Sequence, residues 1–345
     1  MLCYNEGVEQ ILKSRYRTAE KISETPFSLT YRGVFIGTEK PVIIKIYKRG
    51  TLNSTLINHM KRRVREFSLL THHGLAKLLD GDYGWQGFYY VREFVEGMSL
   101  ADLLKKEGKI DAERATVIID QILSVLEEVH ARGIVHGALK PTNIFIDQQG
   151  IIKLTDFIIE GEVKETLPLK VQEIMANAQY ATPEEAAGCP ATVSSDLYVL
   201  GLIFFEMVSG KLLFPEGGLK VSLRKLRPAM LLNPEELSFL PRYLAEIIAK
   251  ALQRDPLIRF SSATEFRESL RRKGVAKKGV ENEEYLRILE SLIPSYIEEV
   301  KTESEAVEKL GRLRWSKEKH RNWLLAVILA VAVLVGILYA FLLGR

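Results

Sequence analysis

The sequence predicts an α+β protein, with strands in its N-terminal part, helices in the remainder and an apolar helix near the end. Residues 42–47 are rich in β-branched side chains and read as a strand buried on both faces. Residues 113–132 carry apolar side chains at helical spacing and end before Gly133. Residues 323–343 form a run of 21 positions without a charged side chain. Such a run is long enough, as a helix, to span about 30 Å of bilayer core.

Composition agrees with a folded domain in a reducing compartment. The chain has 345 residues, of which 47% are hydrophobic and 27% charged, so it can bury a large core. Its two cysteines, Cys3 and Cys189, are too few for a disulfide framework. The net charge of +4 is modest, and we expect no nucleic-acid partner. The first ten residues are polar and lack the apolar run of a signal peptide.

Six short segments occur in a defined order along the chain. They are residues 42–45 (VIIK), 136–143 (HGALKPTN), 154–158 (LTDFI), 180–184 (YATPE), 195–201 (SDLYVLG) and 254–259 (RDPLIR). Their order and spacing resemble those of the protein kinase superfamily, with its V-A-I-K, H-R-D-L-x-x-x-N, D-F-G and A-P-E signatures. The resemblance implies a bilobal protein-kinase-like fold of the serine/threonine type. An antiparallel β N-lobe is expected at residues 15–95 and a helical C-lobe at residues 96–272.

The segment in the place of the glycine-rich loop has lost its glycines. Ser23, Thr25 and Ser28 stand at the three glycine positions, and Pro26 removes one backbone donor. Glycines there let backbone N–H groups approach phosphate oxygens closely. We therefore expect an ordinary hairpin that holds phosphate poorly.

Lys45 lies in the predicted buried strand, where a charged side chain is costly unless it is paired. The resemblance implies that it contacts nucleotide phosphates and pairs with a glutamate on the next helix. Glu66, on a helix expected to begin near Asn53, is the candidate partner. The spacing after Glu66 is short for the family, so Arg63 is the alternative occupant of that place.

Two residues change the expected adenine pocket. Ile43 replaces a small alanine against the ring and would crowd it. Arg92 falls at the gatekeeper position, where its side chain either plugs the pocket or points to the surface. Both alternatives stay open. Glu93 follows directly and is a candidate nucleotide contact.

The catalytic loop lacks its base. Ala138 stands where the family has the aspartate that orients and deprotonates the attacking hydroxyl. Gly137 replaces the neighbouring arginine, which would pair with a phosphorylated loop residue. Neither side chain can accept a proton, so no catalytic residue is expected at these positions.

Other parts of the site are retained. Lys140 stands where the resemblance implies contact with the transferred phosphate, and Asn143 and Asp156 match the two metal ligands. Alternatively, Asn143 and Asp156 hold loop backbone through hydrogen bonds. ATP and Mg²⁺ are cofactors only if the altered pocket accepts nucleotide. The resulting binding candidates are Lys45, Glu66, Glu93, Asn143 and Asp156, the last two as metal ligands.

The C-lobe resemblance also yields structural expectations. Ser99 should cap a helix at residues 100–106. A short strand is expected at residues 144–147, directly after the catalytic loop. Arg259 should pair with Glu184, as in the family.

The C-terminal region is expected to anchor the domain. Residues 273–322 read as a juxtamembrane linker and helix, which packs on the C-lobe or, alternatively, binds a partner. Residues 323–343 read as a single transmembrane helix of a tail-anchored protein. Basic residues stay on the cytoplasmic side of a membrane, so the kinase-like domain should be cytoplasmic. The basic residues before the span are Arg312, Arg314, Lys317, Lys319 and Arg321.

Two functions follow from these residues. The first is a membrane-anchored pseudokinase that acts as a scaffold or allosteric regulator in signalling, with a protein partner such as an active kinase or its substrate. The alternative is a divergent, weakly active ATP-dependent serine/threonine kinase, because phosphoryl transfer depends mainly on positioning and electrostatics. The sequence favours the first, since the missing glycines, Ile43 and Arg92 affect nucleotide binding independently of Ala138.

Overall fold

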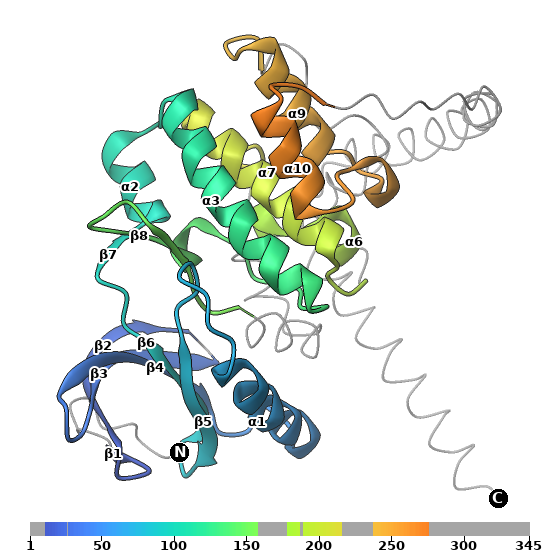
Figure 1. Cartoon of the computed structure of the whole chain (residues 1–345). Coiled ribbons are helices and arrows are strands. Elements are labelled where there is room, and N and C mark those ends of the chain that lie inside the picture. Colours follow the sequence, from blue (N-terminus) through green and yellow to red (C-terminus); the bar gives the residue numbers. More distant parts are fainter. Residues whose placement is uncertain (1–10, 26, 158–177, 187–188, 216–236, 276–345) are drawn as a thin grey trace, which may run out of the picture. The chain divides into compact units, whose positions relative to one another are not determined.

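The computed structural model describes most of the two predicted lobes (Figure 1). The described residues are 11–25, 27–157, 178–186, 189–215 and 237–275, all within one compact unit. The predicted membrane span at residues 323–343 and most of the linker before it lie outside this set. Among the helices that are described, none is both long and apolar enough to cross a membrane.

A six-stranded antiparallel sheet forms the N-lobe, in the order β1-β2-β3-β4-β6-β5. Its strands are β1 (Ile11–Leu12), β2 (Tyr16–Glu24), β3 (Ser28–Phe35), β4 (Lys40–Lys48), β5 (Leu78–Gly84) and β6 (Gly87–Glu93). Residues 42–47 lie in β4, inside the sheet. Ile44 and Ile46 join one apolar cluster and Tyr47 joins another. Because successive side chains of a strand face opposite sides, both faces of β4 are buried, as predicted.

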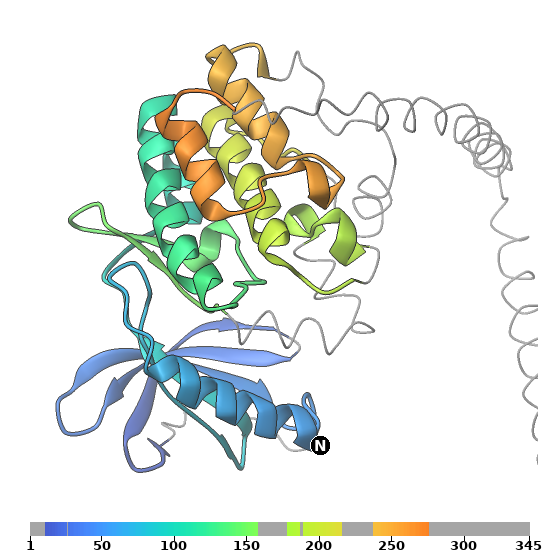
Figure 2. The same ribbon diagram turned by 45° about the vertical axis from the view of Figure 1, so that its right-hand side comes forward.

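Helix α1 (Ser54–Ser68) packs against the sheet (Figure 2). Its N-cap is Asn53, whose side chain accepts a hydrogen bond of 2.8 Å from the backbone N–H of Leu56. This confirms the predicted helix start. The buried face is set by residues spaced three or four positions apart, namely Leu56, Met60, Val64 and Phe67.

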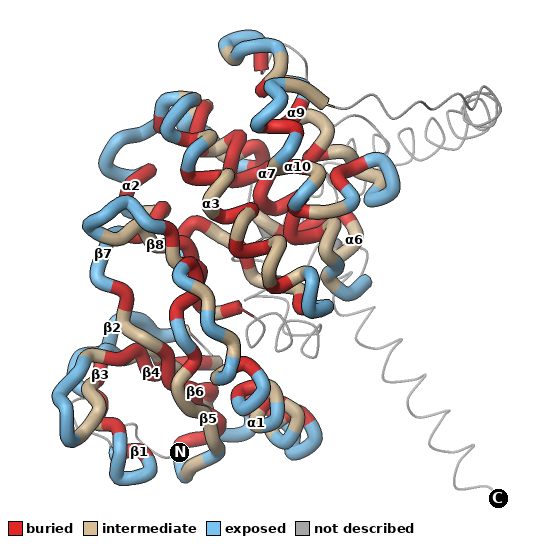
Figure 3. Tube along the Cα trace, viewed as in Figure 1, coloured by how far each residue is buried: buried red, intermediate tan, exposed pale blue. Residues whose placement is uncertain are grey.

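The C-lobe combines a small sheet with a helical core. Strands β7 (Gly97–Ser99), β8 (Ile144–Asp147) and β9 (Ile152–Leu154) pair antiparallel. The helices are α2 (Leu100–Glu107), α3 (Ala112–Ala131), α6 (Pro183–Ala186), α7 (Val193–Ser209), α9 (Arg242–Ala251) and α10 (Ala263–Arg271). Helix α7 is buried on nearly all sides, as its largely red trace in Figure 3 shows, and it contacts α3 and α9. The predicted helices at residues 100–106 and 113–132, the Ser99 cap and the strand at residues 144–147 are confirmed.

Arg259 and Glu184 form the predicted ion pair inside the C-lobe. Two parallel hydrogen bonds of 2.8 Å join the guanidinium to the carboxylate. The Arg259 side chain is fully buried, and its remaining donors reach the backbone oxygens of Gln253, Arg254 and Ser194. This satisfaction of the donors is what makes a buried guanidinium tolerable.

Candidate active site

The catalytic loop is fastened to helix α7 by one carboxylate. Asp196, in the first turn of α7, accepts hydrogen bonds from the backbone N–H groups of His136 (2.8 Å) and Gly137 (3.0 Å). His130 Nε2 lies 2.8 Å from the same side chain. Gly137 has a φ of +68°, a conformation that glycine adopts without steric cost. The residue that replaces the family arginine therefore fits the local backbone.

Sequence reasoning did not assign this role to Asp196. A signal was present, because a carboxylate in an otherwise apolar helix must find donors when it is buried. The partners themselves lie about sixty positions earlier in the chain and follow only from the fold.

Ala138 lies within this ordered loop. The Asn143 side chain donates a hydrogen bond of 3.0 Å to the backbone oxygen of Ala138. The Asn143 backbone oxygen accepts one of 2.9 Å from the N–H of Thr155, just before Asp156. The structural alternative for Asn143 thus has direct support: it ties the catalytic loop to the Asp156 segment. The loop keeps its shape around a methyl group at the base position.

Asp156 is engaged by two donors from strand β6. The Tyr90 hydroxyl and the Arg92 Nε each lie 2.8 Å from Asp156 Oδ1. The Arg92 side chain is only 8% exposed, and its Nη1 donates to the backbone oxygen of Glu93 at 3.2 Å. The two alternatives left open for Arg92 are thereby resolved, because the guanidinium points inward to Asp156 and not to the surface. Tyr90 was missed, although it lies two positions before Arg92 and so shares its face of the strand.

The charges around Asp156 keep it ionised. Burial alone would raise the pKa of Asp156, but Arg92, Lys45 and the Tyr90 hydrogen bond outweigh it and hold that pKa well below its ordinary value. Asp156 also has a φ of +57°, which is uncommon for a residue other than glycine. The carboxylate is therefore held as an anion in a conformation that its surroundings must maintain.

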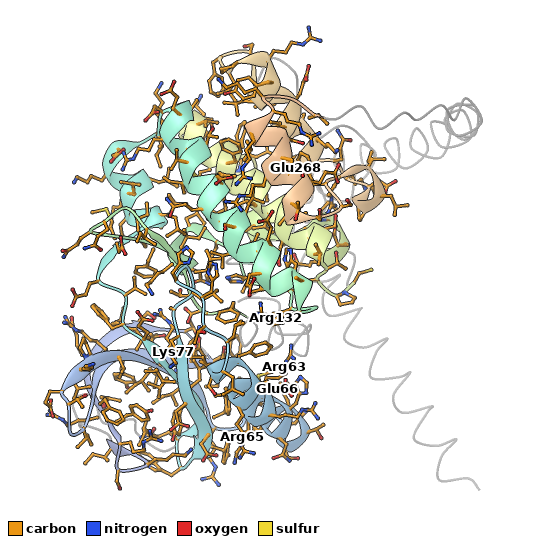
Figure 4. All side chains as sticks on the ribbon, viewed as in Figure 1. Arg63, Arg65, Glu66, Lys77, Arg132 and Glu268 are labelled. Carbon is orange, nitrogen blue, oxygen red and sulfur yellow. The ribbon has the colours of Figure 1, made fainter. Side chains whose placement is uncertain are left out.

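The predicted ion pair between Lys45 and Glu66 is replaced by other contacts. Glu66 has a side chain that is 49% exposed, and it pairs with Arg63 at 3.3 Å and Arg62 at 3.8 Å on its own helix (Figure 4). The reason is helical periodicity: Val64 and Phe67 face the sheet, and Glu66, one of the two positions between them, turns toward solvent.

Arg63, the alternative occupant, lies closer to the interior than Glu66. Its side chain is 26% exposed, and its guanidinium lies 4.4 Å from the centre of the Phe67 ring. Phe67 in turn contacts Phe157, which follows Asp156. Lys45 contributes to the field at Asp156 and lies 5.8 Å from the Tyr47 ring centre.

Of the remaining residues singled out for the nucleotide site, Glu93 is also engaged within the protein. The Glu93 side chain accepts from the backbone N–H of Lys77 at 3.1 Å and pairs with Lys153 at 3.2 Å. Ile43 is buried in β4 directly across from Arg92 of β6. Lys140 lines a cavity of about 340 Å³ next to helix α2, which Tyr180 and Glu206 also line.

The hairpin between β2 and β3 uses its own side chain to hold its backbone. Thr25 Oγ1 accepts hydrogen bonds from the N–H groups of Ser28 (2.9 Å) and Phe27 (3.2 Å). In a glycine-rich loop such N–H groups would face phosphate oxygens. This geometry supports the ordinary-hairpin interpretation of the sequence.

A divalent metal does not fit the site in this arrangement. Mg²⁺ requires oxygen ligands in near-octahedral geometry. Asp156 Oδ1 already accepts bonds from Arg92 and Tyr90, and the Asn143 amide group binds the Ala138 backbone. The residue types are those of the family, but Asp156 Oδ1 and the Asn143 amide nitrogen are already bonded within the protein, and the Arg92 guanidinium, itself a cation, lies beside the carboxylate.

Comparison with known proteins places this geometry in a family. Residues 16–270 match the protein kinase domain. The chain is 30% identical over 267 residues to the probable serine/threonine-protein kinase PknB of Lactococcus lactis, covering 75% of this chain and 42% of the relative. It is 30% identical over 266 residues to the serine/threonine-protein kinase PrkC of Bacillus subtilis, covering 75% and 40%. It is 31% identical over 267 residues to PknA of Mycobacterium tuberculosis, covering 75% and 61%.

The matching part thus spans less than two thirds of these relatives' own length. All three carry the name of a serine/threonine kinase, which favours the kinase alternative over the pseudokinase reading. The fold and the ordered signature segments agree with the matched range. This chain belongs to the protein kinase domain family.

Proposed function

We propose that this protein is a pseudokinase, a member of the protein kinase family that acts in signalling through its folded surface. The observation that carries the proposal is the catalytic loop. Asp196 and Asn143 hold it in an ordered conformation, yet its reacting position is the methyl group of Ala138. The loop has kept its structural bonds and lost the group that would accept the substrate proton.

The nucleotide side of the site supports the same proposal. Arg92 and Tyr90 engage Asp156, and Thr25 occupies backbone donors of the β2–β3 hairpin. These contacts are independent of Ala138, so restoring one feature leaves the others in place. A protein with this site would act on a partner by contact, and an active kinase or its substrate is the partner class we propose.

A second function has support from the comparisons. The relatives are named serine/threonine kinases, a class that uses ATP and Mg²⁺, and this chain retains Lys45, Lys140, Asn143 and Asp156. A weakly active, ATP-dependent serine/threonine kinase would need Asp156 released from Arg92. The two proposals therefore differ in whether Asp156 is released from Arg92 so that it can bind metal and nucleotide.

A phosphotransfer assay distinguishes them. Full-length protein in detergent micelles is incubated with radiolabelled ATP, Mg²⁺ or Mn²⁺ and a generic serine/threonine substrate, beside a Lys45→Ala variant. We expect equal background labelling from both proteins. Labelling well above background that Lys45→Ala abolishes would establish the kinase and reject the pseudokinase.

We further propose that residues 323–343 anchor the protein in a membrane with the kinase-family domain in the cytoplasm. Support comes from the uncharged run and from the basic residues that precede it. Protease treatment of sealed vesicles with their cytoplasmic face outward should degrade the domain. Protection of the domain at residues 15–272 would show that the orientation is reversed.

A further inference from the structure

We propose that the guanidinium of Arg92 is a built-in cation, which takes the place of a divalent metal at Asp156 and closes the site to Mg²⁺. This inference rests on the proposed function only in treating Asp156 as the carboxylate that would bind metal. It makes closure of the site to divalent metal a property of this chain, set by one side chain of strand β6.

The first support is the geometry at the carboxylate. Arg92 Nε and the Tyr90 hydroxyl both donate to Asp156 Oδ1 at 2.8 Å. A metal ion at that oxygen needs a lone pair directed at it, and two hydrogen-bond donors already use that atom. Neither donor can remain in place if a cation binds Oδ1, and a cation at Oδ2 would share the carboxylate with the Arg92 guanidinium.

The second support is the way in which Arg92 is held. Its Nη1 donates to the backbone oxygen of Glu93 at 3.2 Å, and its guanidinium carbon lies 5.9 Å from the centre of the Phe145 ring. The side chain is 8% exposed, and that of Asp156 is 14% exposed. The guanidinium is thus fixed by a carboxylate, a carbonyl and an aromatic face, and ordinary rotamer motion would break all three contacts.

The third support is the local charge. The Asp156 carboxylate lies in the field of two cations, Arg92 and Lys45. Its negative charge is therefore already compensated before any metal approaches. A divalent ion would meet like-charge repulsion from Arg92 in a largely buried environment, where charges are weakly screened.

The pair also joins distant parts of the chain. Arg92 belongs to β6 of the N-lobe sheet, whereas Asp156 follows β9 of the C-lobe, 64 positions later. A bound metal between nucleotide and protein would be lost with its ligand, but this internal cation is always present. The contact therefore links the two lobes without a bound ligand.

The test measures metal binding and needs no catalytic activity. Full-length protein in detergent is titrated with Mn²⁺, and binding is followed by electron paramagnetic resonance and by the thermal midpoint. Four proteins are compared with the wild type: Arg92→Met, Arg92→Lys, the double variant Arg92→Met with Asp156→Asn, and Arg267→Met. Arg267 is the matched control, because its Nε also lies 2.8 Å from an aspartate, Asp120, within the C-lobe.

We expect no Mn²⁺ binding and no thermal shift for the wild type and for Arg267→Met at millimolar metal. Arg92→Met should unfold several degrees lower without metal and regain part of this loss with Mn²⁺, since a ligand that binds only the folded state stabilises it. The double variant should not respond to metal. Arg92→Lys should resemble the wild type, because it keeps a cation near the carboxylate.

Two results would overturn the inference. The first is Mn²⁺ binding by the wild type that a fifth variant, the single change Asp156→Asn, abolishes. The second is a folded Arg92→Met variant that does not respond to metal. If Arg92→Met does not fold, Arg92→Gln replaces it. The wild-type titration is an independent test, because Mn²⁺ binding at Asp156 in the wild type would itself contradict closure of the site. Phosphotransfer is scored separately, so a metal-binding wild type without kinase activity would reject this inference and leave the pseudokinase proposal standing.

Discussion

The part of the chain that the structure describes contains two buried arginine–carboxylate pairs with similar distances and different consequences. In the C-lobe, Arg259 holds Glu184 through two bonds of 2.8 Å, and the pair fastens one structural segment to another. Between the lobes, Arg92 contacts Asp156 through one bond of 2.8 Å, supported by the Tyr90 hydroxyl. The first pair belongs to the frame of the family. The second uses a residue that the family would keep for a ligand.

The difference shows how a fold can be retained while a side chain of the protein takes the contacts that a ligand would make in the site. The donors of Arg259 are satisfied by protein atoms alone, and no ligand has a place there. Asp156 retains the residue type of a ligand-binding group, but its partner now comes from within the chain. A residue type that matches the family is therefore weaker evidence for the family's chemistry than a match in the groups that the residue contacts.

The largest effect is expected for Arg259→Met. Removing this guanidinium leaves Glu184 buried without its counter-ion, and such losses cost about 3–5 kcal/mol of the free energy of unfolding. Urea denaturation of the full-length protein in detergent measures the change. The exposed pair of Arg242 with Glu246 supplies the control, since Arg242→Met should change stability very little. A loss no larger than in that control would remove the structural role given to Arg259.

A smaller loss is expected for Arg92→Met, about 2 kcal/mol, which is typical of a hydrogen bond to a charged group. Asp156 keeps the Tyr90 hydroxyl and the nearby Lys45 charge after the substitution, whereas Glu184 keeps the Ser195 hydroxyl and a backbone hydrogen bond but loses its cation. The same urea denaturation measures it. If Arg92→Met lowers the free energy of unfolding as much as Arg259→Met does, the two pairs stabilise the fold equally. The contrast drawn between them would then be wrong.

The loss of folding stability at acidic pH offers a third test, which concerns the Glu184–Arg259 pair. Burial alone would raise the pKa of Glu184, but Arg259 and Ser195 outweigh it and hold that pKa below its ordinary value of 4.5. A folded-state pKa below the unfolded one stabilises the protein above the unfolded value. That contribution is lost as pH falls through the folded value.

The wild type should therefore lose stability as the pH falls below about 4.5, and Glu184→Gln should show a shallower decline. Thermal midpoints across this range, with Glu246→Gln as the exposed control, provide the measurement. If the thermal midpoint of Glu184→Gln falls with pH as steeply as that of the wild type, other carboxylates account for the loss of stability in acid. Asp156 also has a lowered pKa and adds to it in the same direction.

The sequence predicted the helices, strands and structural ion pair of the domain better than it predicted the contacts of the candidate site. The C-lobe helices, the Ser99 cap and the Glu184–Arg259 pair follow from local periodicity and from signature segments at their usual spacing. The expected contact of Lys45 with Glu66 is not formed, because a difference of one position on α1, from Phe67 to Glu66, turns a side chain from the core to solvent. The direction of Arg92 could not be derived, because its partner lies 64 positions away and is placed by the packing of the lobes.

The smallest effect is expected from repairing the catalytic loop alone. Ala138→Asp restores the residue type of the base in a loop that Asp196 and Asn143 already hold in place. The nucleotide side would still contain Arg92 at Asp156 and Thr25 bonded to the hairpin backbone.

Phosphotransfer by Ala138→Asp should therefore stay near background in the radiolabelled ATP assay. Adding Arg92→Met to Ala138→Asp should raise labelling more than either change alone, because only the pair supplies a base and frees the carboxylate. Full recovery by Ala138→Asp alone would show that the contacts at Asp156 yield readily to nucleotide. In that case, the two arginine pairs would differ in their lability, and the site would be a dormant kinase site that lacks one residue.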